Sequence, residues 1–290
     1  MRDRNKNKTG YKKTKIGWIP KEWGIVHLHE CSEIMFSNVD KKININEEPV
    51  MLCNYNDVYN NEIITNHIQF MKATATKLEI IKYSLQKGDV IITKDSETAD
   101  DIGIPSNVNE NLDHVLCGYH LALIRPDKKM LLGNYLSKLL RLHEYQYHFS
   151  KRANGITRFG LTTHVIQQLF IPLPPLSEQK EIVKILSAWD KAIDQIQKLI
   201  NAKQRLKKGF IFKVLLGSLR FPEFIGHVSK NKAKDIHKKL SIGLIPIDWK
   251  TVKVFDLFYE VKKYSSDLQS YPLYSLTISR RLLCMRGLYS

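Results

Sequence analysis

Residues 171–217 read IPLPPLSEQKEIVKILSAWDKAIDQIQKLINAKQRLKKGFIFKVLLG. Neither proline nor glycine interrupts residues 176–208, and apolar side chains recur there at heptad spacing. This pattern predicts a coiled-coil-type helix over residues 176–217, about 60 Å long, with Ser177 as its N-cap and Gly217 at its end. Such a wide apolar stripe needs a partner helix. The residues that we expect to pack against it are Ile182, Ile185, Trp189, Ile193, Ile196, Leu199, Leu206 and Phe210.

The sequence before this helix has the pattern of a globular domain over residues 16–175. Short apolar stretches bounded by turn residues predict strands, and a longer apolar periodicity predicts a helix. We expect strands at 24–28, 49–58, 90–93, 120–125 and 166–172, a helix at 131–149 and a long polar loop at 95–114. The fold class expected is therefore α+β, followed by the long helix.

One phrase of the sequence occurs twice. Residues 16–28 (IGWIPKEWGIVHL) and residues 242–254 (IGLIPIDWKTVKV) share six identical residues at a period of 226. A period this long indicates a duplicated domain with its connector, not a solenoid. We therefore expect a second, truncated domain at 242–290, joined by a basic linker at 218–241. Residues 1–15 are polar and basic and are expected to form a flexible tail.

The net charge of +16 is unevenly distributed. Residues 1–24 hold eight Lys and Arg against two acids, and residues 197–241 hold twelve against two. Basic runs favour a phosphate backbone, because each neutralised phosphate releases counterions; the alternative is a merely soluble basic surface. No apolar run is long enough for a membrane span or a signal peptide, and the four cysteines form no Cys-x-x-Cys pair. We expect a cytoplasmic protein with reduced cysteines and no membrane partner.

The sequence contains no recognisable catalytic motif. Gly155 and Gly160 are not followed by the Lys-Ser/Thr of a phosphate loop, and no dinucleotide fingerprint is present. The acidic loop around Asp100 lacks the spacing of a calcium loop, and His27 and His29 lack further metal ligands. We therefore expect no catalytic residue, no metal site and no cofactor in this chain.

One short loop has the composition of a DNA contact. Arg can bind guanine and Asn can bind adenine through two hydrogen bonds, whereas Lys and Thr usually contact phosphates. The alternative is that these residues only cover the domain surface. The candidates in this loop are Lys151, Arg152, Asn154, Thr157 and Arg158.

Four motifs resemble the specificity subunit of a type I restriction–modification enzyme, over about residues 16–258. They are Ile19-Pro-Lys-Glu-Trp, Gly88-Asp-Val-Ile-Ile-Thr, Gly155-Ile-Thr-Arg-Phe-Gly-Leu and the Leu-Pro-Pro-Leu-Ser-Glu-Gln that opens the helix. The resemblance implies that two target recognition domains each read half of a split site in double-stranded DNA, held apart by two antiparallel helices. Residues 16–175 would be the first such domain, and 176–217 its spacer helix. We further expect that loops around 94–98 and 151–158 read base edges, which adds Lys94, Ser96 and Thr98 to the candidates.

The resemblance also implies the partners. Modification subunits dock on the helices, hold S-adenosylmethionine and methylate adenine, and restriction subunits add ATP- and Mg-dependent translocation and cleavage; the specificity subunit is not catalytic. The shortened second domain departs from this pattern. It leads us to expect a homodimer through residues 177–216, or alternatively a fragment that binds modification subunits as a scaffold or regulator without reading DNA. A self-sufficient nuclease or methylase is the least favoured interpretation.

Overall fold

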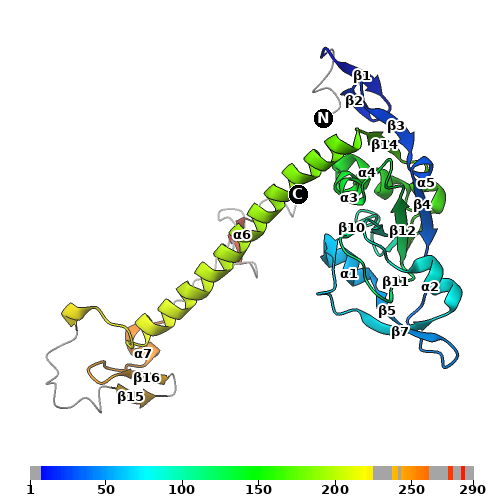
Figure 1. Ribbon diagram of the computed structural model, residues 1–290. Helices are drawn as coiled ribbons and strands as arrows, with labels where there is room; N and C mark the ends of the chain where they lie inside the picture. Colours follow the sequence, from blue (N-terminus) through cyan, green and yellow to red (C-terminus); the bar gives the residue numbers. More distant parts are fainter. Residues whose placement is uncertain (1–7, 225–236, 241–242, 261–273, 277–281, 285–290) are drawn as a thin grey trace, which may run out of the picture. The chain divides into compact units, whose positions relative to one another are not determined.

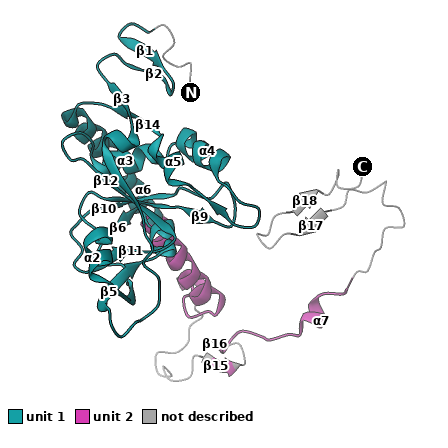
Figure 2. Ribbon diagram, turned by 90° about the vertical axis from the view of Figure 1, so that its right-hand side faces the viewer, with its two compact units in different colours: residues 1–197 teal, residues 198–290 magenta. Residues whose placement is uncertain are grey.

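The computed structural model describes residues 8–224, 237–240, 243–260, 274–276 and 282–284 of the 290-residue chain. The chain divides into two compact units, residues 1–197 and residues 198–290, and the boundary between them lies within the long helix (Figure 2). Each unit is described by itself.

The core of the first unit is a five-stranded sheet in the order β4-β12-β8-β10-β6, of which Figure 1 labels β4, β12 and β10. Its pairs are antiparallel except for β10 with β6. The bounds are β4 Ser32–Phe36, β6 Ile63–Ile64, β8 Val90–Thr93, β10 Pro105–Val108 and β12 Leu121–Pro126. All four residues of β8 are buried, which agrees with its uninterrupted apolar sequence.

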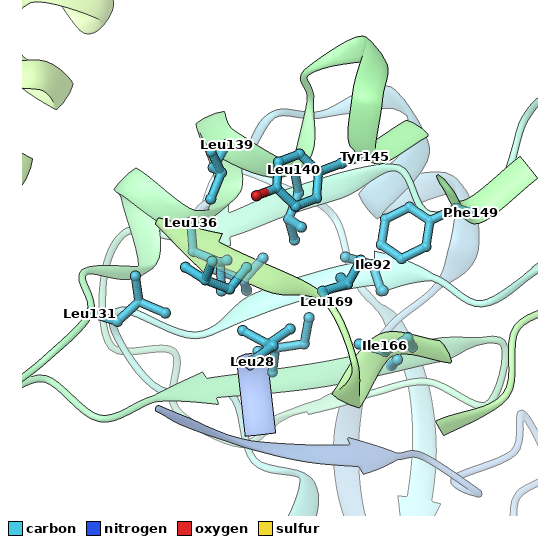
Figure 3. Close-up of a cluster of buried hydrophobic side chains, with 14 of the residues drawn as sticks. Leu28, Ile92, Leu131, Leu136, Leu139, Leu140, Tyr145, Phe149, Ile166 and Leu169 are labelled. Atoms are coloured by element: carbon cyan, nitrogen blue, oxygen red, sulfur yellow. The ribbon is translucent and has the colours of Figure 1, made fainter. Parts of the chain in front are cut away.

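The two faces of this sheet bury different layers. Along β8, Val90 and Ile92 join one apolar cluster while Ile91 joins the other, as the alternation of side chains along a strand requires. The first face is covered by α3 (Gly133–Leu140), α4 (His143–Arg152) and α5 (Thr163–Gln167). Figure 3 shows Leu136 and Leu140 of α3 and Phe149 of α4 pointing toward Ile92 and Leu28 in this cluster.

A three-stranded sheet, in the order β11-β5-β7, packs against the second face. Two short helices, α1 and α2, accompany it. The bounds are β5 Glu48–Cys53, α1 Tyr55–Asn60, β7 Met71–Ala75, α2 Lys77–Tyr83 and β11 Val115–Cys117. Helix α2 begins at a capping box in which the Thr76 hydroxyl accepts from the Glu79 N–H at 3.3 Å.

A strand near the start of the first unit pairs with a strand just before the long helix. β3 (Gly24–His27), which continues into a short 3-10 turn at Leu28–Glu30, pairs antiparallel with β14 (Phe170–Leu173). β1 (Tyr11–Thr14) and β2 (Gly17–Pro20) form a hairpin that comes directly before β3 in the sequence. Part of the segment predicted as a flexible tail is therefore a strand; residues 1–7 lie outside the described part of the chain.

The long helix α6 spans Leu176–Leu215, which is 40 residues and confirms the predicted helix. It begins one residue before Ser177, so Ser177 does not cap it; instead the Gln179 N–H donates to the Pro175 carbonyl at 3.0 Å. It ends at Leu215, two residues before Gly217, whose φ of 70° is the left-handed conformation that favours glycine.

The start of α6 is fixed to the first unit by side chains of the Leu-Ser-Glu-Gln sequence. Gln179 is fully buried, accepts from the Leu132 N–H at 2.9 Å and donates to the carbonyls of Met130 and Pro174, both at 2.9 Å. The Trp23 indole donates to Glu178 at 3.0 Å. This explains in physical terms why glutamate and glutamine stand at the start of the helix.

The second unit holds short elements after the helix. Of the hairpin β15–β16, strand β16 falls on the repeated phrase and β15 lies in the segment predicted as a linker. Residues 225–236 of that linker, and most of the predicted second domain after residue 260, lie outside the described part of the chain. The bounds are η2 Pro222–Phe224, β15 His237–Leu240, β16 Gly243–Pro246, α7 Val254–Leu257, β17 Tyr274–Leu276 and β18 Leu282–Cys284.

The α+β class is confirmed, but four local predictions are wrong in part. The strand expected at 166–172 begins only at Phe170, because Ile166 and Gln167 belong to α5. Residues 95–114 are not one loop, because they contain β10. The helix expected at 131–149 is two helices that meet near Leu142, and the strand expected at 49–58 ends at Cys53, where α1 follows. Buried polar contacts account for β10: the Ser106 hydroxyl donates to the Val58 carbonyl at 2.8 Å.

Candidate nucleic-acid interface

Several loops of the first unit meet at one edge of its two sheets. β12 pairs antiparallel with both β4 and β8, so β12 begins where those two strands end. β5 and β11 are parallel and end side by side at Cys53 and Cys117. The loops after these strands share this edge, and those after β4, β5 and β11 line a pocket of about 240 Å³. We call the set the loop edge; it comprises residues 37–42, 54–55, 94–98, 118–120 and 151–160.

The structure brings together the two loops that were predicted separately as DNA contacts. β9 (Asp95–Ser96) pairs antiparallel with β13 (Phe159–Gly160). Next to this pair, the Leu161 N–H donates to the Lys94 carbonyl at 2.8 Å. The 94–98 loop and the 151–160 loop are therefore neighbours on the loop edge, although more than fifty residues separate them in the sequence.

The tip of the second loop is a closed turn. Asn154 and Gly160 exchange two backbone hydrogen bonds of 3.0 and 2.9 Å. Gly155 has a φ of 147°, and a Cβ there would collide with the Arg158 carbonyl oxygen, so this turn needs glycine. The turn leaves Thr157 and Arg158 exposed and without a hydrogen bond or ion pair to any described residue.

Lys94 and Ser96 have structural contacts that the sequence did not suggest. Lys94 is only 12% exposed, forms an ion pair with Asp95 at 2.9 Å and lies 4.9 Å from the Tyr119 ring centre. His120 contacts the same Asp95 oxygen at 2.8 Å. Ser96 is buried, and its hydroxyl accepts from the Thr98 N–H at 3.3 Å. These two residues shape the loop, whereas Thr98 is exposed on it.

The predicted basic residues of α4 lie on its last turn and are exposed. Lys151 makes no ion pair with a described residue. Arg152 donates to Nδ1 of His148 at 3.1 Å. Burial and the nearby Arg152 charge lower the pKa of His148, so its imidazole is neutral near pH 7 and can accept this hydrogen bond. The Arg152 guanidinium is thereby held at the surface.

Sequence reasoning missed the aromatic part of the loop edge. Tyr119 is half exposed and stands edge-on to His120, and Tyr55 stacks on Tyr59 with ring centres 5.6 Å apart. The Asp101 carboxylate accepts a hydrogen bond from the Tyr59 hydroxyl and raises the Tyr59 pKa. No spacing in the sequence marks these residues, because the strand ends that place them are distant from one another.

The acidic stretch of the 95–101 segment is used for internal contacts. Asp95 holds Lys94 and His120, and Asp100 accepts from the Ser150 hydroxyl at 2.7 Å. Among the described residues no group of three or more His, Cys, Asp or Glu is arranged to hold a metal ion. No helix in the described part of the chain is long and apolar enough to cross a membrane.

The predicted packing face of α6 is exposed over most of its length. Trp189 is 68% exposed and Ile193 is 62% exposed. Ile182 differs, because it is half-buried against the core of the first unit. The remaining members of the predicted face are exposed by 49–58%: Ile185, Ile196, Leu199, Leu206 and Phe210. Apart from Ile182, the face is therefore largely exposed in the described part of the chain.

Comparisons with known proteins agree with these features. The family model of the type I restriction modification DNA specificity domain matches residues 20–204. The MjaX type I restriction enzyme specificity subunit of Methanocaldococcus jannaschii is 30% identical over 84% of this chain and 54% of its own length. The MjaVIII specificity subunit of the same organism is 27% identical over 81% of this chain and 49% of its own length. The chain thus spans about half the length of these relatives.

Among solved structures, a chain from a study of complex assembly and conformational transition of the type I R-M system has a TM-score of 0.49 at 24% identity, over 69% of this chain and 47% of that one. The HsdS subunit from Thermoanaerobacter tengcongensis has a TM-score of 0.44 at 22% identity, over 72% and 48%. Because the family model covers most of the chain, from the end of β2 into α6, this protein belongs to the type I restriction–modification DNA specificity family.

Proposed function

We propose that this chain is a DNA-recognition subunit of a type I restriction–modification complex and reads one half of a split site through the loop edge. The observation that carries the proposal is the pairing of β9 with β13. It joins the 94–98 loop to the turn at 154–160, so one surface presents a guanidinium, an amide and hydroxyl groups. The family assignment supports this choice over other uses of a basic surface.

The residues of the loop edge have different roles in this proposal. Arg158 and Asn154 lie on the closed turn and have the chemistry to read guanine and adenine edges in the major groove. Lys151 and Arg152, on the last turn of α4, contact phosphates and fix the register. Lys94 does not contact DNA in this scheme, because its ammonium group is held by Asp95.

The catalytic steps belong to partner subunits in this proposal. A modification subunit docks on the outside of α6, away from the apolar stripe, and supplies S-adenosylmethionine, and restriction subunits supply the ATP- and Mg-dependent steps. A target adenine must leave the base stack before it can be methylated, which requires an enclosing pocket. The pocket of about 240 Å³ on the loop edge is too small to enclose both a base and a methyl donor.

A second copy of the chain is the further partner that we propose for the α6 face. Two copies of α6, paired antiparallel, would bury both stripes and form a two-fold dimer. Such a dimer would read a palindromic split site, with half-sites spaced by the helix. Light scattering on the pure protein tests this: a mass of one chain at high concentration contradicts the dimer.

Selection from random duplex DNA tests the proposed function. The chain is purified with its modification subunit, bound duplexes are recovered by gel shift, and they are sequenced over several rounds. We expect one enriched motif. A stable complex without sequence preference would refute DNA reading and favour the scaffold alternative. Failure of the two subunits to co-purify would refute docking on α6.

A further inference from the structure

Each copy of the duplicated phrase supplies the second strand of a hairpin, β2 or β16, and the two hairpins have the same register. Lys12 pairs with Ile19 in β1–β2, and their counterparts Lys238 and Ile245 pair in β15–β16. Each hairpin turns at a glycine with positive φ, 117° at Gly17 and 123° at Gly243. After each hairpin a tryptophan N–H donates to the proline carbonyl three residues before it, at 3.2 Å in both cases. The repeat is thus a structural unit with a fixed geometry.

The second hairpin shows what this unit packs against. Gly217, at the end of α6, is buried, and a Cβ there would collide with the Pro246 ring and lie 3.2 Å from Trp249. Arg220 completes the contact through an ion pair of 2.9 Å with Asp248. Near the turn, a Cβ on Gly243 would lie 3.7 Å from the Leu216 side chain. Together these contacts seat the hairpin on the end of α6, as Figure 1 shows.

The equivalent positions of the first hairpin are preserved. Gly17, Pro20, Glu22 and Trp23 correspond to the four residues of the second hairpin that contact the helix end. Glutamate in place of aspartate keeps the negative charge that would pair with an arginine. The first hairpin therefore carries the complete set of side chains for binding such a helix end.

In the first unit, Gly17, Pro20 and Glu22 do not have the contacts that their counterparts in the second hairpin make with the end of α6. A Cβ added to Gly17 would meet no atom within 4 Å. Pro20 is half-buried, whereas its counterpart Pro246 is buried. Glu22 is exposed and forms no ion pair with a described residue. Gly17 also lines a groove of about 820 Å³, whose mixed lining includes the apolar residues Leu142 and Phe170.

We propose that the β1–β2 hairpin is a docking surface for the C-terminal end of α6 from a second copy of this chain. In the complex, the partner's Gly217 packs on Pro20 and Trp23, the partner's Leu216 enters the groove beside Gly17, and the partner's Arg220 pairs with Glu22. The proposal rests on the pairing of two α6 helices put forward above and adds the site that fixes their ends.

The docking surface also sets the register of the two helices. Trp23 already donates to Glu178 at the start of its own α6. If the same tryptophan contacts the partner's Gly217, the two helices run antiparallel with full overlap. Residues of one heptad series then face residues of the other, as antiparallel coiled coils require. The facing pairs are Ile185 with Phe210, Trp189 with Leu206 and Ile196 with Leu199.

Docking in trans competes with the hairpin that already sits on the helix end. β15–β16 follows α6 in the same chain, so its effective concentration at Gly217 is high. The first hairpin of a second copy must displace it. Weakening the contact within the chain should therefore strengthen dimerisation, which an interface made by the helix stripe alone does not predict.

Sedimentation velocity on the full chain tests this competition. The double variant Pro246→Asp/Asp248→Arg removes the proline contact and places a positive charge opposite Arg220. We expect its dimer to form at a concentration at least tenfold lower than that of the unmodified chain. If the substitutions unfold the second hairpin instead, the helix end is still freed, so the expectation is unchanged.

A third substitution then tests the docking surface itself. Adding Glu22→Arg to the double variant should reverse the gain, because the introduced guanidinium would repel the partner's Arg220. Adding Lys21→Glu should leave the gain in place, since Lys21 is exposed and its counterpart Ile247 carries no charge that could pair with the helix end.

Two results would overturn the proposal: a double variant that dimerises no more tightly than the unmodified chain, or equal effects of Glu22→Arg and Lys21→Glu. DNA selection with the modification subunit is measured separately on the unmodified chain. An enriched motif together with either of these results would refute the docking surface and leave the proposed function standing.

Discussion

Replacing Gln179 by leucine should loosen the joint between the long helix and the first unit. The glutamine side chain is fully buried and satisfies three backbone groups, the Leu132 N–H and the carbonyls of Met130 and Pro174. Leucine has a similar volume, so the packing changes little, but all three groups lose their partner. Each buried unpaired group costs about 1–3 kcal/mol, and with partial relaxation we expect a loss of about 3 kcal/mol.

Thermal and urea unfolding of the purified chain would measure this loss. For a domain of this size, about 3 kcal/mol corresponds to a fall in Tm of roughly 6–12 °C. The matched control is Gln195→Leu, the same substitution at an exposed position of the same helix, which should change stability by less than about 0.5 kcal/mol. Equal Tm values for the two variants would refute the claim that Gln179 anchors the helix.

Other consequences concern the loop edge and the core. Arg158→Ala should weaken binding to the preferred duplex by about 1–3 kcal/mol in a gel shift, whereas Lys87→Ala, at the opposite end of β8, should have little effect. Arg152→Ala should weaken all duplexes alike and reduce the slope of log affinity against log salt by about one. The pKa of His148 is lowered in the folded protein, so as the pH falls the unfolded state takes up a proton on this histidine before the folded state does. The free energy of unfolding should therefore decrease as the pH drops below about 6.5, and it should decrease less in His148→Asn. Urea unfolding at several pH values measures both. Phe149→Ala should cost about 3–5 kcal/mol of unfolding free energy, because this ring is fully buried in the cluster of Figure 3.

Patterns with a strong period were predictable from the sequence. The heptad series identified α6 to within two residues of its end, and the uninterrupted apolar sequence of β8 identified a buried strand. The strand β10 was not predictable, because a hydrogen bond from Ser106 to α1 buries a polar residue at its centre, and only Val108 of the strand joins an apolar cluster. The break near Leu142 was also hidden, since an apolar leucine there continues the helical pattern of α3.

The candidate site was predictable only in part, for a related reason. The composition of the 151–158 loop pointed to Arg158 and Asn154, which the structure leaves exposed on the closed turn. Lys94 was expected to contact DNA as well, but its ammonium group is held between Asp95 and the Tyr119 ring. These neighbours come from separate strand ends, and only the sheet pairing brings them together.

The central claim is that this chain selects the DNA sequence on which a partner enzyme acts. Methylome sequencing of cells that express the chain with its modification subunit tests it most directly, with the modification subunit alone as the control. We expect methylated adenine at one new split motif, and loss of that motif with Arg158→Ala. Methylation that is absent, or that has the same sequence context with and without this chain, would contradict the account.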